Sequence, residues 1–330
     1  MKFSNALQRI GQLILVIIGS TFLASFLIRL LPVSLADIYI VNPDPIGRAK
    51  EIHDLGLDLD PFRYYIFWAK DFFTGNLGYY IFPGGARELV SDHLSRSLPI
   101  TLLIILYVQV VALAVAIPLG IWSAYKVGTR TDRIISNILF ITSSIPGFVL
   151  ALLMAFYIGV KLGWVPPLGY APLRCSAEDN ALNAACGINE HFKLMVLPVI
   201  SLAVPLVASY ARLLRTDVIA TLREDFVTMA ASKGLTNRRI LWTHVFRPSS
   251  VTLFTSAALN MGGLIGGALV IENLFSIPGI GFEIALSIFG RQYFALQAYI
   301  AVIAVGYVFF NVVVDIMVTR IDPRTKQRRV

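Results

Sequence analysis

The side chains able to carry out chemistry are few and scattered along this chain of 330 residues. The histidines, at positions 53, 93, 191 and 244, do not form the HExxH pair of a metalloprotease. The two cysteines form no CxxC pair, and no histidine cluster stands near them, so a zinc site is not indicated. No GxxxxGK[ST] segment occurs, so we do not expect the chain to hydrolyse ATP. We therefore predict no catalytic residue, no metal site and no cofactor bound by this chain.

The most informative polar stretch runs from residue 224 to residue 248 and reads EDFVTMAASKGLTNRRILWTHVFRP. Its first part has a helical period, and Gly234 follows where a left-handed C-terminal cap is expected. Thr236 stands where it could cap a second short helix. Two short helices joined by a glycine would make a knob able to dock on a soluble partner. The alternative is a solvated hairpin whose arginines hold it against anionic lipid. The residues at helical spacing are Phe226, Met229, Ala230 and Lys233, then Ile240, Leu241, His244 and Val245.

The composition indicates that these residues are positioned by membrane helices. Hydrophobic residues make up 56% of the chain and charged residues only 15%, against about a quarter in soluble domains. About 20 apolar residues are needed to cross a bilayer, and six runs are long enough. We therefore predict an all-α polytopic membrane protein with six transmembrane helices. The runs are Ile10–Leu31, Leu98–Ala124, Ile134–Val160, Leu194–Leu214, Val251–Ile271 and Tyr293–Thr319.

Lysine and arginine gather in the segments on one side of these spans: before the first span, between the second and third, between the fourth and fifth, and after the last. The positive-inside rule places that side, with both termini, in the cytoplasm. The opposite loops are acidic, and we expect Glu272 and Glu283 in the last of them. The chain then divides into 1–97, the first helix with a folded extracytoplasmic loop, and 98–330, a five-helix core.

The first extracytoplasmic loop is too long to be a simple connection and should fold. Asp60 followed by Pro61 predicts a helix start, with a side-chain acceptor at the N-cap and proline at the first position. We favour an amphipathic cap on the membrane interface over a ligand-binding role.

Three further features allow alternatives. Cys175 and Cys186 share one extracytoplasmic loop, where we favour a disulfide over two free thiols. Pro278, Gly279 and Gly281 could shape a re-entrant turn near an outer gate, or a simple surface turn. Overlapping GxxxG patterns in the fifth span predict close helix packing rather than a substrate contact, and they involve Gly262, Gly263, Gly266 and Gly267.

The polar stretch resembles the EAA loop of ABC-importer permeases. DFVTMAASKGL, Asp225 to Leu235, is similar to the DYVRTARAKGL pattern of the dipeptide, oligopeptide and nickel permeases. The resemblance continues in LGLDLDPFRYY and GNLGYY of the first long loop, in FSIPGIG from Phe275 to Gly281, and in the ending NVVVDIMVTRIDPR. It covers nearly the whole chain and indicates the first, B-type membrane subunit of that family.

The resemblance implies a type I ABC importer in the cell inner membrane. This subunit would pair with a homologous second permease, two ATPases would bind the EAA loops, and an extracytoplasmic binding protein would deliver substrate. ATP and Mg²⁺ would be bound by the ATPases. The family motif assigns the coupling role to Asp225, Ala230, Ala231, Lys233, Gly234, Leu235, Arg238, Arg239 and Arg247.

Two other classes of protein compete with this interpretation. A channel or secondary transporter would work without an ATPase and would show internal repeats, of which none is convincing here. A polytopic membrane enzyme has little support from the scattered histidines. The substrate that we favour is a di- or oligopeptide, because peptide importers prevail in the family, with nickel as an alternative.

Overall fold

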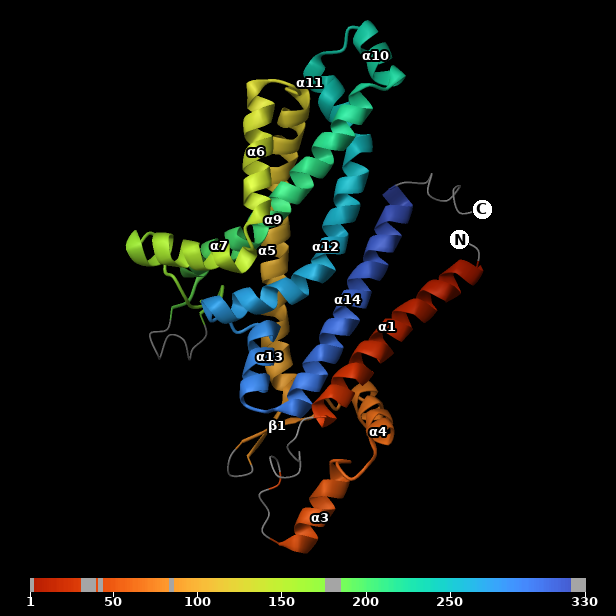
Figure 1. Ribbon diagram of the computed structural model, residues 1–330, viewed down its shortest axis with the longest axis vertical. Coiled ribbons are helices and arrows are strands. Elements are labelled where there is room, and N and C mark those ends of the chain that lie inside the picture. The colour runs from red at the N-terminus through yellow and green to blue at the C-terminus, as the bar shows by residue number, and fades with distance from the viewer. Residues whose placement is uncertain (1–2, 31–39, 41–43, 83–85, 176–184, 322–330) are drawn as a thin grey trace. The chain divides into compact units, whose positions relative to one another are not determined.

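The computed structural model describes residues 3–30, 40, 44–82, 86–175 and 185–321 (Figure 1). The described residues are mostly helical and include a short antiparallel hairpin in which Tyr79 pairs with Leu89. The elements in chain order are α1 (Phe3–Arg29), α3 (Pro45–Asp54), α4 (Pro61–Phe73), β1 (Tyr79–Ile81), β2 (Arg87–Leu89), α5 (Val90–Tyr125), α6 (Arg130–Ser144), α7 (Gly147–Met154), the π-helix η1 (Ala155–Lys161), α9 (Ile188–Leu222), α10 (Asp225–Ser232), α11 (Asn237–Arg239), the π-helix η2 (Ile240–Val245), α12 (Phe246–Phe275), α13 (Ile280–Phe289) and α14 (Tyr293–Ile321). The basic residues predicted beyond residue 321 lie outside the described part.

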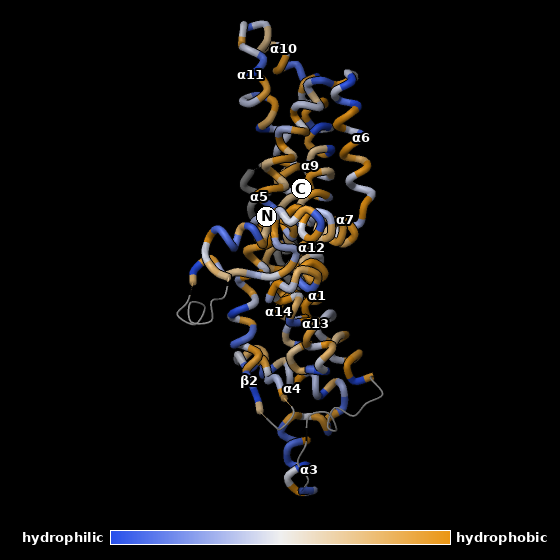
Figure 2. The backbone as a smooth tube through the Cα atoms, turned by 90° about the vertical axis from the view of Figure 1, so that its left-hand side faces the viewer, coloured by the Kyte–Doolittle hydropathy of each residue, from blue (hydrophilic) through white to orange (hydrophobic). Residues whose placement is uncertain are grey.

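The helices confirm a polytopic membrane protein. Within the described residues, four are long and apolar enough to cross a bilayer: α5, α9, the run from α11 through α12, and α14. A fifth span results if α6 and the α7–η1 segment count as one bent span. The first predicted span falls on α1, in which the segment Ile14–Arg29 is apolar but shorter than the four helices above. Figure 2 shows hydrophobic residues along the long helices and hydrophilic residues gathered on α3.

The third predicted span is not one straight helix, as Ile134–Val160 was expected to be. It breaks at Pro146, and the helices on either side meet at 95°. Ile145, just before the proline, has φ −89° and ψ 122°, because a following proline disfavours the helical region. Pro146 also has no N–H to donate to the preceding turn.

The described chain forms two compact units, the first from residues 1–100 and 278–309 and the second from residues 101–277 and 310–330. The predicted boundary between residues 97 and 98 falls inside α5. The division into 1–97 and 98–330 stays a prediction.

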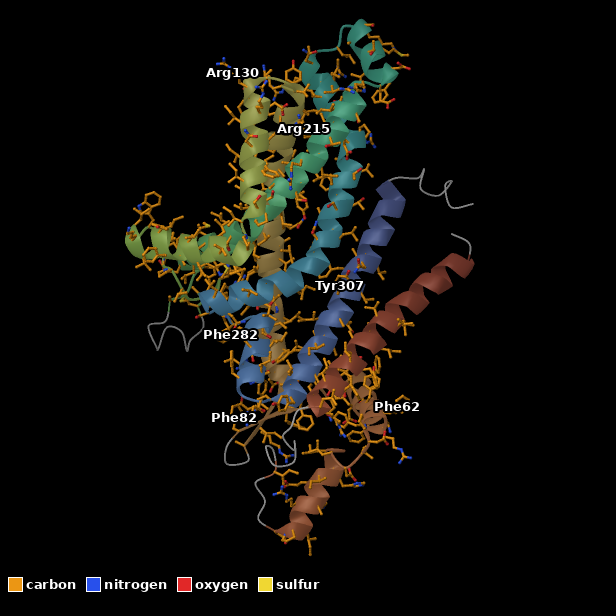
Figure 3. The ribbon with its side chains drawn as sticks, viewed as in Figure 1. Phe62, Phe82, Arg130, Arg215, Phe282 and Tyr307 are labelled. Carbon is orange, nitrogen blue, oxygen red and sulfur yellow. A yellow bond between two sulfur atoms is a disulfide. The ribbon has the colours of Figure 1, made fainter. Side chains whose placement is uncertain are left out.

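In the first unit, α4 packs against α1 and α14. The helix starts as predicted, since the Asp60 carboxylate accepts hydrogen bonds from the backbone N–H groups of Phe62 and Arg63 at 3.1 Å each. The buried face of α4 carries aromatic side chains. Tyr64 and Trp68 are buried and form one cluster with Ala301 of α14. Phe62, in contrast, is exposed (Figure 3).

The guanidinium of Arg29, the last residue of α1, contacts α4 and the loop before it. It lies 4.2 Å from the centre of the Tyr64 ring and donates hydrogen bonds to the backbone carbonyls of Gly56 and Leu59. The loop before α4 is thereby tied to the end of α1.

A buried polar cluster connects β1 with α13 and α14. The Tyr80 hydroxyl donates to a Glu283 carboxylate oxygen at 2.9 Å and lies 3.1 Å from Ser287 Oγ and 3.2 Å from the Tyr299 hydroxyl. Burial, helped by the negative charge of Glu283, raises the pKa of Tyr80 to about 12, so the phenol stays protonated and remains a donor. The hairpin is therefore attached to α13 and α14 through hydrogen bonds, and Ile81 also packs against Tyr293 and Phe294 at the start of α14.

In the second unit, α9 is the central helix and packs against α6, α7 and α12. Helix α5 comes close to α9 at Gly120, where an added Cβ would lie 2.9 Å from the backbone oxygen of Ala211. Gly263 and Gly266 do not provide the predicted close packing against another described helix, because no described atom outside their own helix backbone lies within 4 Å of a Cβ added there.

We predict that Gly120→Ala lowers the stability of the protein by about 2 kcal/mol, because backbone and the Leu214 side chain leave no room for a methyl group. Gly263→Ala is the matched control, and we expect it to change stability by less than about 1 kcal/mol. The measurement is the thermal unfolding midpoint of each purified variant in one detergent. Equal midpoints would contradict the close packing of α5 on α9.

Candidate functional site

The segment 224–248 is an ordered helical knob at one end of α9 and α12 (Figure 1). Gly234 has φ +76°, which confirms the predicted left-handed conformation. The second arm is not a separate short helix, however. The helix that starts after Thr236 continues through η2 into α12, so the arm is the beginning of a span. Thr236 stands at the N-cap position, but its side chain makes no capping hydrogen bond.

The widened turns of η2 lie just before Pro248. Proline cannot donate a hydrogen bond to the carbonyl four residues earlier, and π-turns are a common way for a helix to absorb such a break. The helix therefore passes Pro248 without stopping. The helix from Asn237 to Phe275 is thus continuous, although α12 bends along its length (Figure 1).

The predicted apolar face of α10 is only partly correct. Val227 and Ala230 are the buried residues and hold α10 against the knob, while Phe226 and Met229 are 45% and 58% exposed. On the second arm, Ile240 and Val245 are buried as expected, and Trp242 is 49% exposed. The knob thus keeps a small apolar interior and presents three large apolar side chains on its surface.

The residues assigned to the knob from the family motif lie together, most of them exposed. Ala230 is buried and Leu235 is half-buried. Arg238 and Arg239 line a shallow surface pocket with Thr236 and Trp242. The remaining members are on the surface: Asp225, Ala231, Lys233, Gly234 and Arg247. The surface therefore carries both exposed apolar and exposed basic side chains, and Trp242 stands beside Arg238 and Arg239.

A charged cluster that the sequence analysis missed stands at the base of the knob. The Arg215 guanidinium on α9, labelled in Figure 3, makes two hydrogen bonds of 2.8 Å to the carboxylate of Asp132 on α6. Ser123 Oγ of α5 and the backbone N–H of Gly128 donate to the same carboxylate at 2.6 and 3.0 Å. The cluster ties α5, α6 and α9 together below the point where the chain leaves α9. No spacing rule links residues so far apart in the chain, so the pattern alone could not show it.

Two further contacts anchor this end of the unit. Asn237 Nδ2 of α11 donates to the Tyr125 hydroxyl of α5 at 3.2 Å, and Ser249 Oγ of α12 donates to Thr221 Oγ1 of α9 at 2.9 Å. The knob is therefore joined to α5 as well as to the two helices that it connects.

Glu272 does not lie in a loop, as predicted, but inside α12, where its side chain is fully buried. Thr101 Oγ1 of α5 donates to Glu272 Oε1 at 2.7 Å. The predicted span ended one residue too early, at Ile271, because hydropathy reads a carboxylate as the end of an apolar run. The hydrogen bond explains how the helix can bury this group.

The turn predicted from Pro278, Gly279 and Gly281 separates two helices. Ser276 closes α12 in the left-handed conformation, with φ 56° and ψ 44°. Gly279 is extended and stands at the N-cap of α13, and Gly281 is a buried residue of that helix. The backbone makes a sharp turn here. A gating role stays a prediction.

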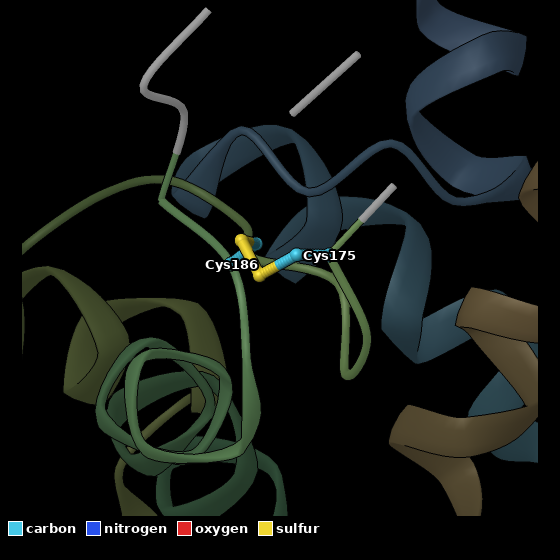
Figure 4. Close-up of a disulfide and its surroundings, with 2 residues drawn as sticks. All are labelled: Cys175 and Cys186. Carbon is cyan, nitrogen blue, oxygen red and sulfur yellow. A yellow bond between two sulfur atoms is a disulfide. The ribbon is translucent and has the colours of Figure 1, made fainter. Parts of the chain in front are cut away.

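The structure places Cys175 and Cys186 in a disulfide, with their Cα atoms 5.2 Å apart (Figure 4). Next to it, the backbone N–H of Gly187 donates to the Pro172 carbonyl at 2.9 Å. His191 Nδ1 lies 2.6 Å from the Ala171 carbonyl oxygen and is buried. These contacts fix the start of α9. In the part of the chain that the structure describes, no group of three or more His, Cys, Asp or Glu residues is placed to hold a metal ion.

Comparison with known proteins gives consistent findings. The family described as binding-protein-dependent transport system inner membrane component matches residues 116–327. The chain is 30% identical to the di/tripeptide transport system permease protein DppB of Pseudomonas aeruginosa, over 98% of each chain. It is 29% identical to the oligopeptide transport system permease protein AppB of Bacillus subtilis, over 94% of this chain and 95% of that protein.

Among solved structures, the methionine ABC transporter MetNI in an inward-facing conformation is similar with a TM-score of 0.55. The match covers 70% of this chain and 96% of that one at 15% identity, which shows the fold alone.

We predict that Asp132→Asn destabilises the protein by about 2 kcal/mol, because it leaves the Arg215 charge without its bidentate partner. This loss of stability is smaller than the loss expected for a fully buried ion pair, because the Arg215 side chain is 26% exposed. Arg133→Gln, which changes an exposed charge on the same helix, is the control and should have little effect. Thermal unfolding in detergent measures both, and equal midpoints would contradict the bracing role of Asp132.

We predict that Cys175 and Cys186 resist alkylation in native membranes until a reductant is added. The check is the mass added by a maleimide before and after reduction. Immediate labelling of both residues would show free thiols and contradict the disulfide.

Proposed function

Since the chain belongs to the family of binding-protein-dependent transport system inner membrane components, we propose that it transports peptides inward as one of two permeases in an importer driven by partner ATPases. The chain is a permease subunit of an ABC importer. Peptide as the cargo is supported by similarity over nearly the full length to relatives named for peptide transport. The homologous second permease and the extracytoplasmic binding protein follow from the family.

The observation that carries the coupling mechanism is the knob at residues 224–248. Its exposed apolar side chains, Phe226, Met229 and Trp242, are of the kind that anchors a protein interface, and the basic residues beside them suit an acidic rim on the partner. We assign the partner as an ATPase, which binds ATP and Mg²⁺. The permease itself would be non-catalytic.

Coupling then follows from how the knob is attached. Val227 and Ala230 hold α10 to the knob, and the second arm runs into α12 without a break. The Asp132–Arg215 cluster braces α9 against α5 and α6. Movement of the ATPase would thus displace helices as rods, and ATP binding would favour one of two permease conformations by differential binding.

The same arrangement supports the predicted orientation. The knob would face the cytoplasm, as an ATPase partner requires, and both termini would lie on that side. The α3–α4 segment and the Cys175–Cys186 loop would lie outside, where an oxidising compartment permits the disulfide. The protein would be a multi-pass component of the cell inner membrane.

We predict that Gly234→Val lowers peptide uptake per ATP hydrolysed by at least about tenfold, because a β-branched residue is strained at φ +76°. No neighbouring atom lies within 4 Å of the added Cβ, so the effect would come from backbone conformation rather than from a clash. Gly234→Asn is the matched control, since asparagine tolerates this conformation, and we expect it to retain most of the coupling.

The measurement uses the complex purified through this chain in mild detergent and reconstituted in liposomes, with uptake and ATP hydrolysis recorded together. Recovery of a second permease and ATPase subunits is the expected composition. Recovery of this chain alone, with transport in the absence of any ATPase, would contradict the proposal and favour a channel or secondary transporter. Equal coupling in the valine and asparagine variants would contradict the role of the knob.

A further inference from the structure

The first unit contains a cavity of about 220 Å³ that none of the functions above uses. It lies between α3, α4, the β1–β2 hairpin and the first turn of α14, and of these elements only α14 is long enough to span a bilayer. Aromatic and acidic side chains dominate its wall, and those that matter here are Glu51, Asp54, Phe67, Trp68, Asp71 and Tyr79.

The sequence explains why these side chains share one cavity. On α4, Tyr64, Phe67, Trp68 and Asp71 follow each other at intervals of three, one and three residues, which puts them on one face of the helix. On α3, Glu51 and Asp54 are three residues apart and lie in the last turn. Trp68 and Tyr64 are buried and form the floor of the cavity, while Phe67 and Tyr79 are partly exposed in its wall.

The charge on the wall is unbalanced. Glu51, Asp54 and Asp71 contribute carboxylates, against the single guanidinium of Arg87. Within the described residues, none of the three carboxylates takes part in an ion pair. The one side-chain hydrogen bond among them joins Asn76 Nδ2 to Asp71 Oδ2 at 3.2 Å. Ionised carboxylates only accept hydrogen bonds, so a ligand here must bring donors and positive charge.

Aromatic rings beside the carboxylates strengthen the same preference. A cation over the face of Trp, Tyr or Phe is attracted by the ring quadrupole, most strongly for Trp. The chain already uses this chemistry at the edge of the cavity, where the Arg29 guanidinium lies 4.2 Å from the centre of the Tyr64 ring. The cavity floor offers the neighbouring ring of Trp68.

The size of the cavity decides what kind of cation it can hold. Pockets that enclose whole small-molecule ligands measure about 300–1,000 Å³, so this one is too small for a peptide and suits a single side chain. Arginine is among the residues that most often anchor protein interfaces in such pockets. We propose that this cavity receives one arginine or lysine side chain of the extracytoplasmic binding protein when that protein docks. The proposal rests on the proposed function, which supplies the partner and the side of the membrane.

The test measures binding of the co-purified binding protein to the complete importer in nanodiscs, at low and at high salt. Asp71→Asn should weaken binding by about tenfold at low salt and by less at high salt, because a charge contact is screened. Asp92→Asn, which removes one exposed carboxylate of the same unit that does not line the cavity, should change affinity by less than about twofold. Asp71→Glu keeps the charge and should restore most of the affinity, which separates a charge effect from misfolding.

A second measurement identifies the occupant. Each arginine and lysine on the contact face of the binding protein is changed to glutamine and paired with Asp71→Asn. One position should show no further loss in the double variant, as expected for two groups in contact. The cation n-butylguanidinium should compete with the binding protein, whereas n-butanol should not.

Three results would overturn the inference: wild-type affinity in Asp71→Asn, equal competition by n-butanol, or displacement of n-butylguanidinium by free peptide but not by the binding protein. If the complex still takes up peptide when ATP is supplied, none of these three results contradicts the proposed function. If no binding protein binds the wild-type complex at all, the proposed function fails first.

Discussion

A bilayer provides no partners for backbone N–H and C=O groups, and most of this structure follows from that constraint. Each crossing segment must satisfy its own backbone, so the apolar runs become helices. Three places depart from a regular, wholly apolar helix. Pro146 breaks the third apolar run into two helices at 95°. The π-turns of η2 carry a span past Pro248. The carboxylate of Glu272 is buried against the Thr101 hydroxyl rather than in lipid.

The coupling that we propose depends on how rigidly the knob is attached to the membrane helices. The second arm of the knob continues into α12, and α9 is held to its neighbours by a charged cluster in which one carboxylate accepts five hydrogen bonds. A flexible connection at either place would let the partner move without moving the spans. The largest exposed apolar side chains of the knob stand on elements whose inner faces are buried, so a partner bound to them would act on packed residues.

Local signals were predictable and distant pairings were not. The start of α4 and the left-handed Gly234 follow from residue types within a few positions of each other, so a sequence suffices. The same Asp-Pro signal occurs at Asp44 and Pro45, where the carboxylate caps α3, and it could have been used there too. The Asp132–Arg215 pair joins helices far apart in the chain, and the cavity wall is assembled from five elements. Hydropathy also misplaced Glu272, since it records the cost of a carboxylate but not the hydroxyl that offsets it.

The disulfide has an evolutionary consequence. With Cys175 bonded to Cys186, and with Gly187 and His191 held to the backbone of residues 171 and 172, both ends of the intervening segment are fixed whatever lies between them. Loop closure entropy grows only by about 0.6 kcal/mol for each doubling of length. Insertions and deletions between the two cysteines are therefore nearly neutral for the register of α9. A change in the number of residues between the two cysteines would therefore leave the start of α9 in place.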